Sequence, residues 1–205
     1  MLTRHDKFPG PDCKILFDCD FLLSFPLVGW PSPAQEWVAR ERFWPDQEVV
    51  TRLASLPCHL IAKPSYEEDL TSWRFSFSRQ EIELSQILPL NARLCYLGLK
   101  LIFKKEIKER CPSVLKSYHM LTLFLWFMES RPVHSWEEDS DQSCEFNLRA
   151  LFSFVSLRLE NSDIPHYFIR SLNLGKWTKP EKGKKTLQQV SVFIKQMMTN
   201  LSFPW

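Results

Sequence analysis

Residues 117–131, SYHMLTLFLWFMESR, constrain the fold most, because they are apolar on nearly every face of a helix. The longest apolar run of the chain starts at Leu121 and has eight residues, against the roughly 20 that a membrane-spanning helix needs. A helix of this kind is stable only where other elements cover all its sides. The sequence therefore predicts a central, buried helix in a soluble protein.

Further long elements are predicted around this helix. Residues 93–110 form an amphipathic pattern that ends before Pro112, and two more helical patterns cover residues 143–162 and 186–201. Upstream, Lys14–Phe25 is apolar nearly throughout, which is typical of a strand buried on both faces.

Shorter elements complete the prediction. Ser32 is expected to cap a helix whose first residue is Pro33, and Asp46 to cap a helix that ends at about Leu56. The stretch CHLIA predicts a short strand that ends before Pro64. The predicted fold class is α+β and mainly α, with one or two strands that lead into a helical bundle.

Composition and motifs exclude several classes of protein. The net charge of +2 is too balanced to predict nucleic-acid binding. The six cysteines form no C-x-x-C pair, which indicates buried reduced thiols and neither a disulfide framework nor a zinc site. The five glycines form no G-x-G-x-x-G or P-loop pattern, so those phosphate cradles are excluded. The first residues contain no apolar signal core, and we expect a cytoplasmic or nuclear protein.

The stretch FDCDF places two carboxylates on one strand. Asp18 and Asp20 would point to the same side of the strand, about 7 Å apart. Such a pair is costly to bury unless a cation binds it, and paired divalent ions serve nucleotidyl transfer. The alternative is that this strand end is exposed and the two carboxylates are solvated.

The stretch SWRFSFSRQE is a second candidate for chemistry. Arg74, Ser76 and Ser78 would share one face of an extended segment, where a guanidinium and two hydroxyls suit a phosphate or a carboxylate. The alternative for Ser78 is a capping box with Glu81 that opens the next helix.

The start of the central helix and one lysine are further candidates. Ser117 is expected to be an N-cap at a helix end that attracts anions, and Tyr118 to stack on a base. Alternatively, Tyr118 and His119 are satisfied core groups. Lys100 belongs to a lysine stripe of the kind that is usually solvated, but it follows the apolar half of its helix and can point inward.

Four stretches, in this order, resemble the male-abnormal-21-like family, which includes cyclic GMP-AMP synthase and related innate immune receptors. They are DFLLSFPLVGWP, SWRFSFSRQE, LKSYHMLTLFLWFMES and IPHYFIRSLNL. The resemblance implies the end of a nucleotidyltransferase mixed sheet, followed by a helical HhH/H2TH-like lobe, with nucleotides bound between the two. We expect residues 1–78 to be a remnant of the first lobe and residues 79–205 to form the second.

The resemblance also implies roles for individual residues. Asp20 matches the third of three metal-binding carboxylates, and Asp18 is the alternative because the spacing to Trp30 varies by one residue. The implied cofactor is Mg²⁺ or Mn²⁺, and the implied ligands are ATP and GTP. The positions that match nucleotide contacts are Arg74, Ser76, Ser78, Lys100, Ser117 and Tyr118.

The sequence also departs from the active relatives. It contains no Gly-Ser dipeptide for a triphosphate loop, and the interval between Leu88 and Arg93 holds only PLNA where a zinc insertion would lie. We therefore expect neither a zinc thumb nor DNA recognition of that type. We also expect the chain to have a partner, which is either the missing N-terminal lobe or another protein. Two hypotheses stay open. In the first, this is the nucleotide-binding half of a nucleotidyltransferase, and the truncated chain is inactive. In the second, it is a non-catalytic protein that acts in partner binding or developmental regulation.

Overall fold

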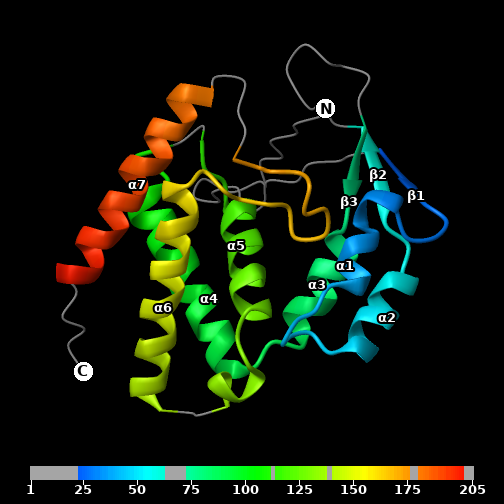
Figure 1. The fold of residues 1–205 in the computed structure, drawn as a ribbon, viewed down its shortest axis with the longest axis horizontal. Coiled ribbons are helices and arrows are strands. Elements are labelled where there is room, and N and C mark those ends of the chain that lie inside the picture. Colours follow the sequence, from blue (N-terminus) through cyan, green and yellow to red (C-terminus); the bar gives the residue numbers. More distant parts are fainter. Residues whose placement is uncertain (1–22, 63–72, 112–113, 138–139, 176–179, 201–205) are drawn as a thin grey trace, which may run out of the picture.

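The computed structural model describes residues 23–62, 73–111, 114–137, 140–175 and 180–200. A small sheet with three short helices lies at one end, and a bundle of longer helices lies at the other (Figure 1). The prediction of an α+β, mainly α fold is confirmed.

The helical bundle is built around α5 (Ser117–Glu129). Every residue of α5 from Thr122 to Glu129 is buried, as its all-round apolar pattern predicts. It lies between the sheet-bearing part and the other helices (Figure 1). These are α4 (Leu90–Ile102), α6 (Asp141–Glu160) and α7 (Pro180–Asn200), of which α4 and α6 pack on α5 and α7 packs on α6.

The helix predicted over residues 93–110 is not one regular α-helix. After α4 the chain continues as a π-helix, Phe103–Ile107, in which the amide of Lys108 donates to the carbonyl of Phe103 at 2.8 Å. Buried residues recur at every fourth position here, a spacing longer than the 3.6-residue turn of an α-helix. The wider π turn therefore keeps them on the core side. They are Cys95, Leu99, Phe103, Ile107 and Cys111.

The sheet has three antiparallel strands in the order β1 (Ser24–Pro26), β2 (His59–Ala62) and β3 (Trp73–Ser76). The short strand predicted before Pro64 is confirmed as β2. The expectation of a strand buried on both faces is wrong for its described end, because Phe25 of β1 is 49% exposed. Among the described strands, β1 has β2 as its neighbour on one side only, so it lies at the edge of the sheet.

Three short helices accompany the strands in this part of the molecule (Figure 1). α2 (Gln47–Ser55) begins as predicted, with Oδ1 of Asp46 accepting from the amide of Val49 at 2.8 Å. The segment at Ser32 is instead a 3-10 turn, Ser32–Ala34, with Pro31 as N-cap, and α1 (Gln35–Ala39) follows it. The third helix of this part is α3 (Ser78–Gln86).

Aromatic rings join the two parts of the molecule. Phe77, between β3 and α3, stacks on Phe168 with 4.5 Å between ring centroids, and Trp37 of α1 lies 5.0 Å from the same ring. Such pairs add stability beyond the area that they bury.

The described cysteines agree with the prediction of free, mostly buried thiols. They are Cys58, Cys95, Cys111 and Cys144. Cys13 and Cys19 lie outside the described residues.

Candidate functional site

The turn from β3 to α3 carries the Arg-Ser-Ser pattern. Arg74 and Ser76 alternate along β3, so they share one face of the strand as predicted, and the hydroxyl of Ser76 lies 3.3 Å from that of Ser78. Ser78 is the first residue of α3, and the N-cap is Phe77 without a side-chain bond. The capping box expected at Ser78 and Glu81 is therefore wrong.

Glu81 turns inward to another helix. Its carboxyl is hydrogen-bonded to Tyr118 of α5, and burial raises its pKa while this bond lowers it. Burial, with the charge of Glu81, raises the pKa of the Tyr118 phenol. Glu81 is half-buried, where a carboxyl without a donor is costly, and its interaction with Tyr118 stands in place of the expected cap.

His166 completes this network. Its Nδ1 accepts from the amides of Phe168 and Ile169, both at 3.1 Å, and its Nε2 lies 3.0 Å from the Tyr118 hydroxyl. Because Nδ1 accepts, Nε2 carries the proton and donates to Tyr118, whose own O–H is then available to Glu81. Burial lowers the pKa of His166 to about 4, so the ring is neutral at pH 7.

α4 contributes an aromatic ring and a lysine beside this network. Tyr96 stacks on Phe124 at 4.7 Å, and burial and the charge of Glu81 raise its pKa to about 12. The ammonium of Lys100, one turn further along α4, lies 5.5 Å from the centre of the Tyr96 ring. Lys100 is exposed, so its charge is available at the edge of the site.

The start of α5 differs from the prediction. The N-cap is Lys116, whose amide donates to Nδ1 of His119 at 3.0 Å, and Ser117 is the exposed first residue of the helix. The expected N-cap at Ser117 is therefore wrong, because the helix already begins at Ser117 and its N-cap is Lys116. Burial, and then the charge of Lys116, lowers the pKa of His119 to about 4.

Two of the predicted nucleotide contacts, Lys100 and Tyr118, are linked to each other through Glu81 and Tyr96, and Ser76 and Ser78 form a separate pair at the start of α3. We call these residues, with His166, the interlobe cluster. It consists of Ser76, Ser78, Glu81, Tyr96, Lys100, Tyr118 and His166. Arg74 shares the strand face of Ser76, and Ser117 precedes Tyr118 in the chain. The nucleotide-contact roles of these residues stay predictions.

Sequence reasoning missed three members of the cluster. Glu81 was interpreted as a helix cap, and no residue type or spacing singled out Tyr96 or His166. The only signal for His166 was its place in the stretch IPHYFIRSLNL, which carried the family resemblance.

The predicted metal ligands Asp18 and Asp20 lie outside the described residues. Within the described part, no group of three or more His, Cys, Asp or Glu residues is placed to hold a metal ion. The described donors therefore do not make a site for Mg²⁺ or Mn²⁺.

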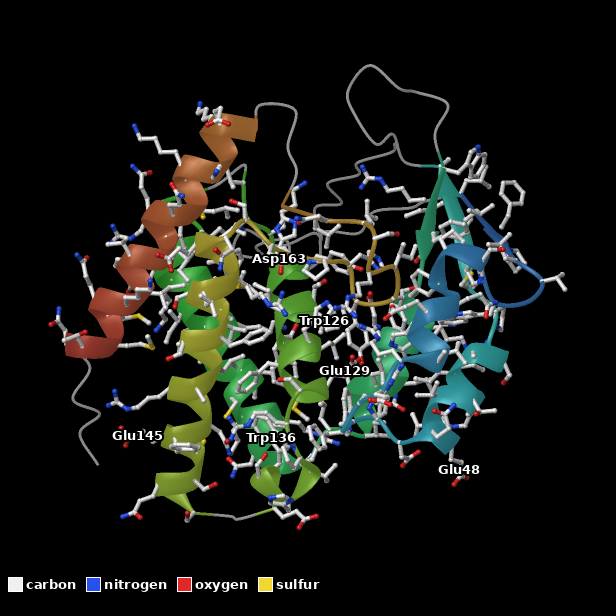
Figure 2. All side chains as sticks on the ribbon, in the orientation of Figure 1. Glu48, Trp126, Glu129, Trp136, Glu145 and Asp163 are labelled. Atoms are coloured by element: carbon white, nitrogen blue, oxygen red, sulfur yellow. The ribbon has the colours of Figure 1, made fainter. Side chains whose placement is uncertain are left out.

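A buried ion pair fixes the two parts of the molecule beside the cluster. Nε of Arg40, which follows α1, lies 3.3 Å from Oε1 of Glu129 in α5, and the two side chains are 5% and 6% exposed. The guanidinium also donates to the carbonyl of Tyr167 at 2.6 Å and lies 4.1 Å above the ring of Trp126. Figure 2 shows Trp126 and Glu129 on the side of α5 that faces α1. Burial raises the pKa of Glu129, and the charge of Arg40 opposes that rise.

Two family models match most of this chain. The Mab-21 protein nucleotidyltransferase domain matches residues 5–85, and the Mab-21 protein HhH/H2TH-like domain matches residues 91–192. The chain belongs to the Mab-21 family. In this Mab-21 chain the interlobe cluster takes residues from both matched domains: β3 and α3 lie in the first, and α4, α5 and His166 lie in the second. The division expected between residues 78 and 79 stays a prediction.

Curated relatives agree with this family. Protein mab-21-like 3 of Danio rerio is 28% identical over 175 residues, which are 80% of this chain and 41% of that protein. Protein mab-21-like 3 of Xenopus laevis is 26% identical over 178 residues, and covers 80% of this chain and 43% of that protein. Protein mab-21-like of Drosophila melanogaster is 22% identical over 182 residues, which are 83% of this chain and 48% of that protein. The chain thus spans less than half of the length of these relatives.

Within the described ranges, no helix combines the length and the hydropathy that crossing a membrane requires. The cellular compartment stays a prediction.

Proposed function

We propose that this chain binds a nucleoside triphosphate, ATP or GTP, at the interlobe cluster. Arg74, Ser76, Ser78 and Lys100 would contact the phosphates, and Tyr118 would lie beside the base. A guanidinium, an ammonium and two hydroxyls are the donors that phosphate oxygens require. The observation that carries the proposal is that Glu81, in the helix that Ser78 begins, interacts with Tyr118 of the second matched domain, which also bonds to His166.

The buried part of the cluster supports the proposal through its rigidity. Tyr118 is held by His166 on one side and by Glu81 on the other, so its ring has a fixed position before a ligand arrives. Binding to a fixed site loses less conformational entropy than binding to a mobile one. Since His166 is neutral at pH 7, the phosphate charge would be met by Arg74 and Lys100.

The proposal includes binding and not turnover by this chain. The sequence contains no Gly-Ser dipeptide, and the resemblance supplies only Asp20 among three metal carboxylates. Nucleotidyl transfer relies on paired divalent ions held by several carboxylates. We therefore propose that the chain alone makes no cyclic dinucleotide from ATP and GTP. The other candidate, a non-catalytic role in partner binding or developmental regulation, is favoured if no nucleotide binds.

Calorimetric titration with ATP and with GTP, each with Mg²⁺, tests the proposal. We expect the Lys100→Ala variant to weaken binding at least tenfold, because a charge-assisted hydrogen bond contributes about 1.5–3 kcal/mol. Ser76→Ala should have a smaller effect. Lys195→Ala is the matched control, because Lys195 pairs with Glu160 on the α6–α7 surface at 2.7 Å and should leave the affinity within about twofold.

Two results would overturn the proposal. The first is the absence of saturable binding to the wild-type chain, and the second is equal weakening by Lys100→Ala and Lys195→Ala. If ion-exchange chromatography detects a dinucleotide product, this contradicts the part of the proposal that excludes turnover.

A further inference from the structure

The outer face of α4 carries four exposed leucines in a line. Leu90, Leu94, Leu97 and Leu101 are 61%, 45%, 52% and 57% exposed. The opposite face of the same helix buries its own set of side chains, so the core does not use these four. We call these four residues the leucine stripe. A contiguous apolar stripe on a water-facing helix marks an interaction surface more often than isolated exposed leucines do.

The spacing of the leucine stripe fits a second helix. The steps between its members are four, three and four residues, which is the repeat of a two-helix seam with Leu94 and Leu101 at the a positions and Leu90 and Leu97 at the d positions. One flank is closed by α6, since a Cβ on Gly98 would lie 3.2 Å from Cδ1 of Leu148. The partner helix therefore meets one open flank only.

That open flank is basic. Arg93 and Lys100 directly precede Leu94 and Leu101, which places them at g positions. Lys104, three residues after Leu101 in the π-helix beyond α4, lies at the end of the stripe itself. All three residues are exposed. A second copy of this face would bring like charges together, which opposes pairing, whereas acidic side chains at the facing positions would form ion pairs.

We propose that the leucine stripe is the docking surface for an amphipathic helix of a protein partner. The partner helix carries Leu or Ile at heptad a and d positions, Glu or Asp along the edge that meets Arg93 and Lys100, and a further acidic residue at the end that meets Lys104. α4 has 13 residues and is about 20 Å long, so three to four turns of the partner would cover the stripe. This inference does not rest on nucleotide binding.

A designed peptide pair tests the inference on the full chain. The first peptide has 21 residues in three heptads, with Ile at a, Leu at d and Glu at e and g, and the second has Lys in place of every Glu. Each peptide repels itself and stays available for binding. In fluorescence anisotropy at low salt, we expect saturable binding of the Glu peptide, at least tenfold tighter than that of the Lys peptide and weaker at 300 mM NaCl.

Variants of the chain locate the binding surface. Leu97→Ser and Lys104→Glu should each weaken the Glu peptide at least fivefold. Leu157→Ser on α6 is the matched control, since Leu157 is 56% exposed outside the leucine stripe, and it should leave the affinity unchanged. All three positions are exposed, so the thermal midpoint should stay near that of the wild type.

Several outcomes would overturn the inference. These are no binding of either peptide, equal binding of both, or equal weakening by Leu97→Ser and Leu157→Ser. A chain that sediments as a dimer and becomes monomeric on Leu97→Ser would assign the stripe to a second copy. Leu97-dependent binding to vesicles of phosphatidylcholine and phosphatidylserine, without binding to the Glu peptide, would assign it to a membrane surface.

Discussion

Replacing Arg40 with methionine should destabilise the fold strongly. Methionine has an unbranched side chain that can fill the space of the arginine stem, but it carries no charge. Arg40→Met therefore leaves the Glu129 carboxylate, whose side chain is 6% exposed, buried without the cation of its ion pair. The variant also loses the hydrogen bond to the Tyr167 carbonyl and the contact with the Trp126 ring. Breaking a buried ion pair from one side costs about 3–5 kcal/mol of unfolding free energy.

Urea and thermal unfolding, monitored by circular dichroism, measure this loss of unfolding free energy. In a chain of this size each kcal/mol lowers the midpoint by about 2–4 °C, so we expect a decrease of roughly 6–20 °C. Arg52→Met is the matched control. Nη1 of Arg52 lies 2.6 Å from Oε2 of Glu83, but the side chains are 47% and 31% exposed, so this pair should contribute less than about 1 kcal/mol.

The pH dependence of the loss separates charge from packing. Burial already raises the pKa of Glu129 above its unfolded value, and removing Arg40 raises it further. A carboxyl with a raised folded-state pKa gains stability as pH falls through that pKa toward the unfolded value. The deficit of Arg40→Met should therefore shrink as pH falls from 7.5 toward the unfolded pKa of a glutamate. A deficit that does not change with pH, or one equal to that of Arg52→Met, would refute the role of the buried charge.

Three further predictions concern the cluster and the core. The lowered pKa of His166, about 4 against 6.5 unfolded, should remove stability as pH falls from 6.5 to 4, up to about 3 kcal/mol. In a plot of unfolding free energy against pH, His166→Asn should make this part less steep, and the slope that remains includes that of His119, whose pKa is also lowered to about 4. Tyr118→Phe should cost about 1–3 kcal/mol in urea unfolding, because Glu81 loses its buried donor. Leu99→Ala should cost about 2–5 kcal/mol in the same assay, whereas Leu97→Ala, on a side chain that is 52% exposed, should stay within about 1 kcal/mol.

Local sequence patterns correctly predicted those elements whose position depends on their own residues and not on distant contacts. The all-round apolar run of α5 required a buried helix, and Asp46 acts as an N-cap by accepting from the amide of Val49 within the same local segment. The alternation along β3 correctly placed Arg74 and Ser76 on one face.

Tertiary contacts decided the rest. Ser78-x-x-Glu81 has the sequence of a capping box, yet Glu81 bonds to Tyr118, which lies 37 positions further along the chain. The π-helix after α4 follows from buried residues at every fourth position, a pattern that becomes visible only once the core side is known. His166 is placed by a loop, and no periodic pattern foretells which loop side chain turns inward.

Thermal unfolding of the wild-type chain and Arg74→Ala, with and without millimolar ATP or GTP and Mg²⁺, tests nucleotide binding most directly. A ligand at a hundredfold excess over its dissociation constant adds about 2.7 kcal/mol of stability, which corresponds to a rise in the midpoint of roughly 5–10 °C. We predict this rise for the wild type and its loss in Arg74→Ala. The absence of a rise in both, or an equal rise in both, would contradict a nucleotide site at the interlobe cluster.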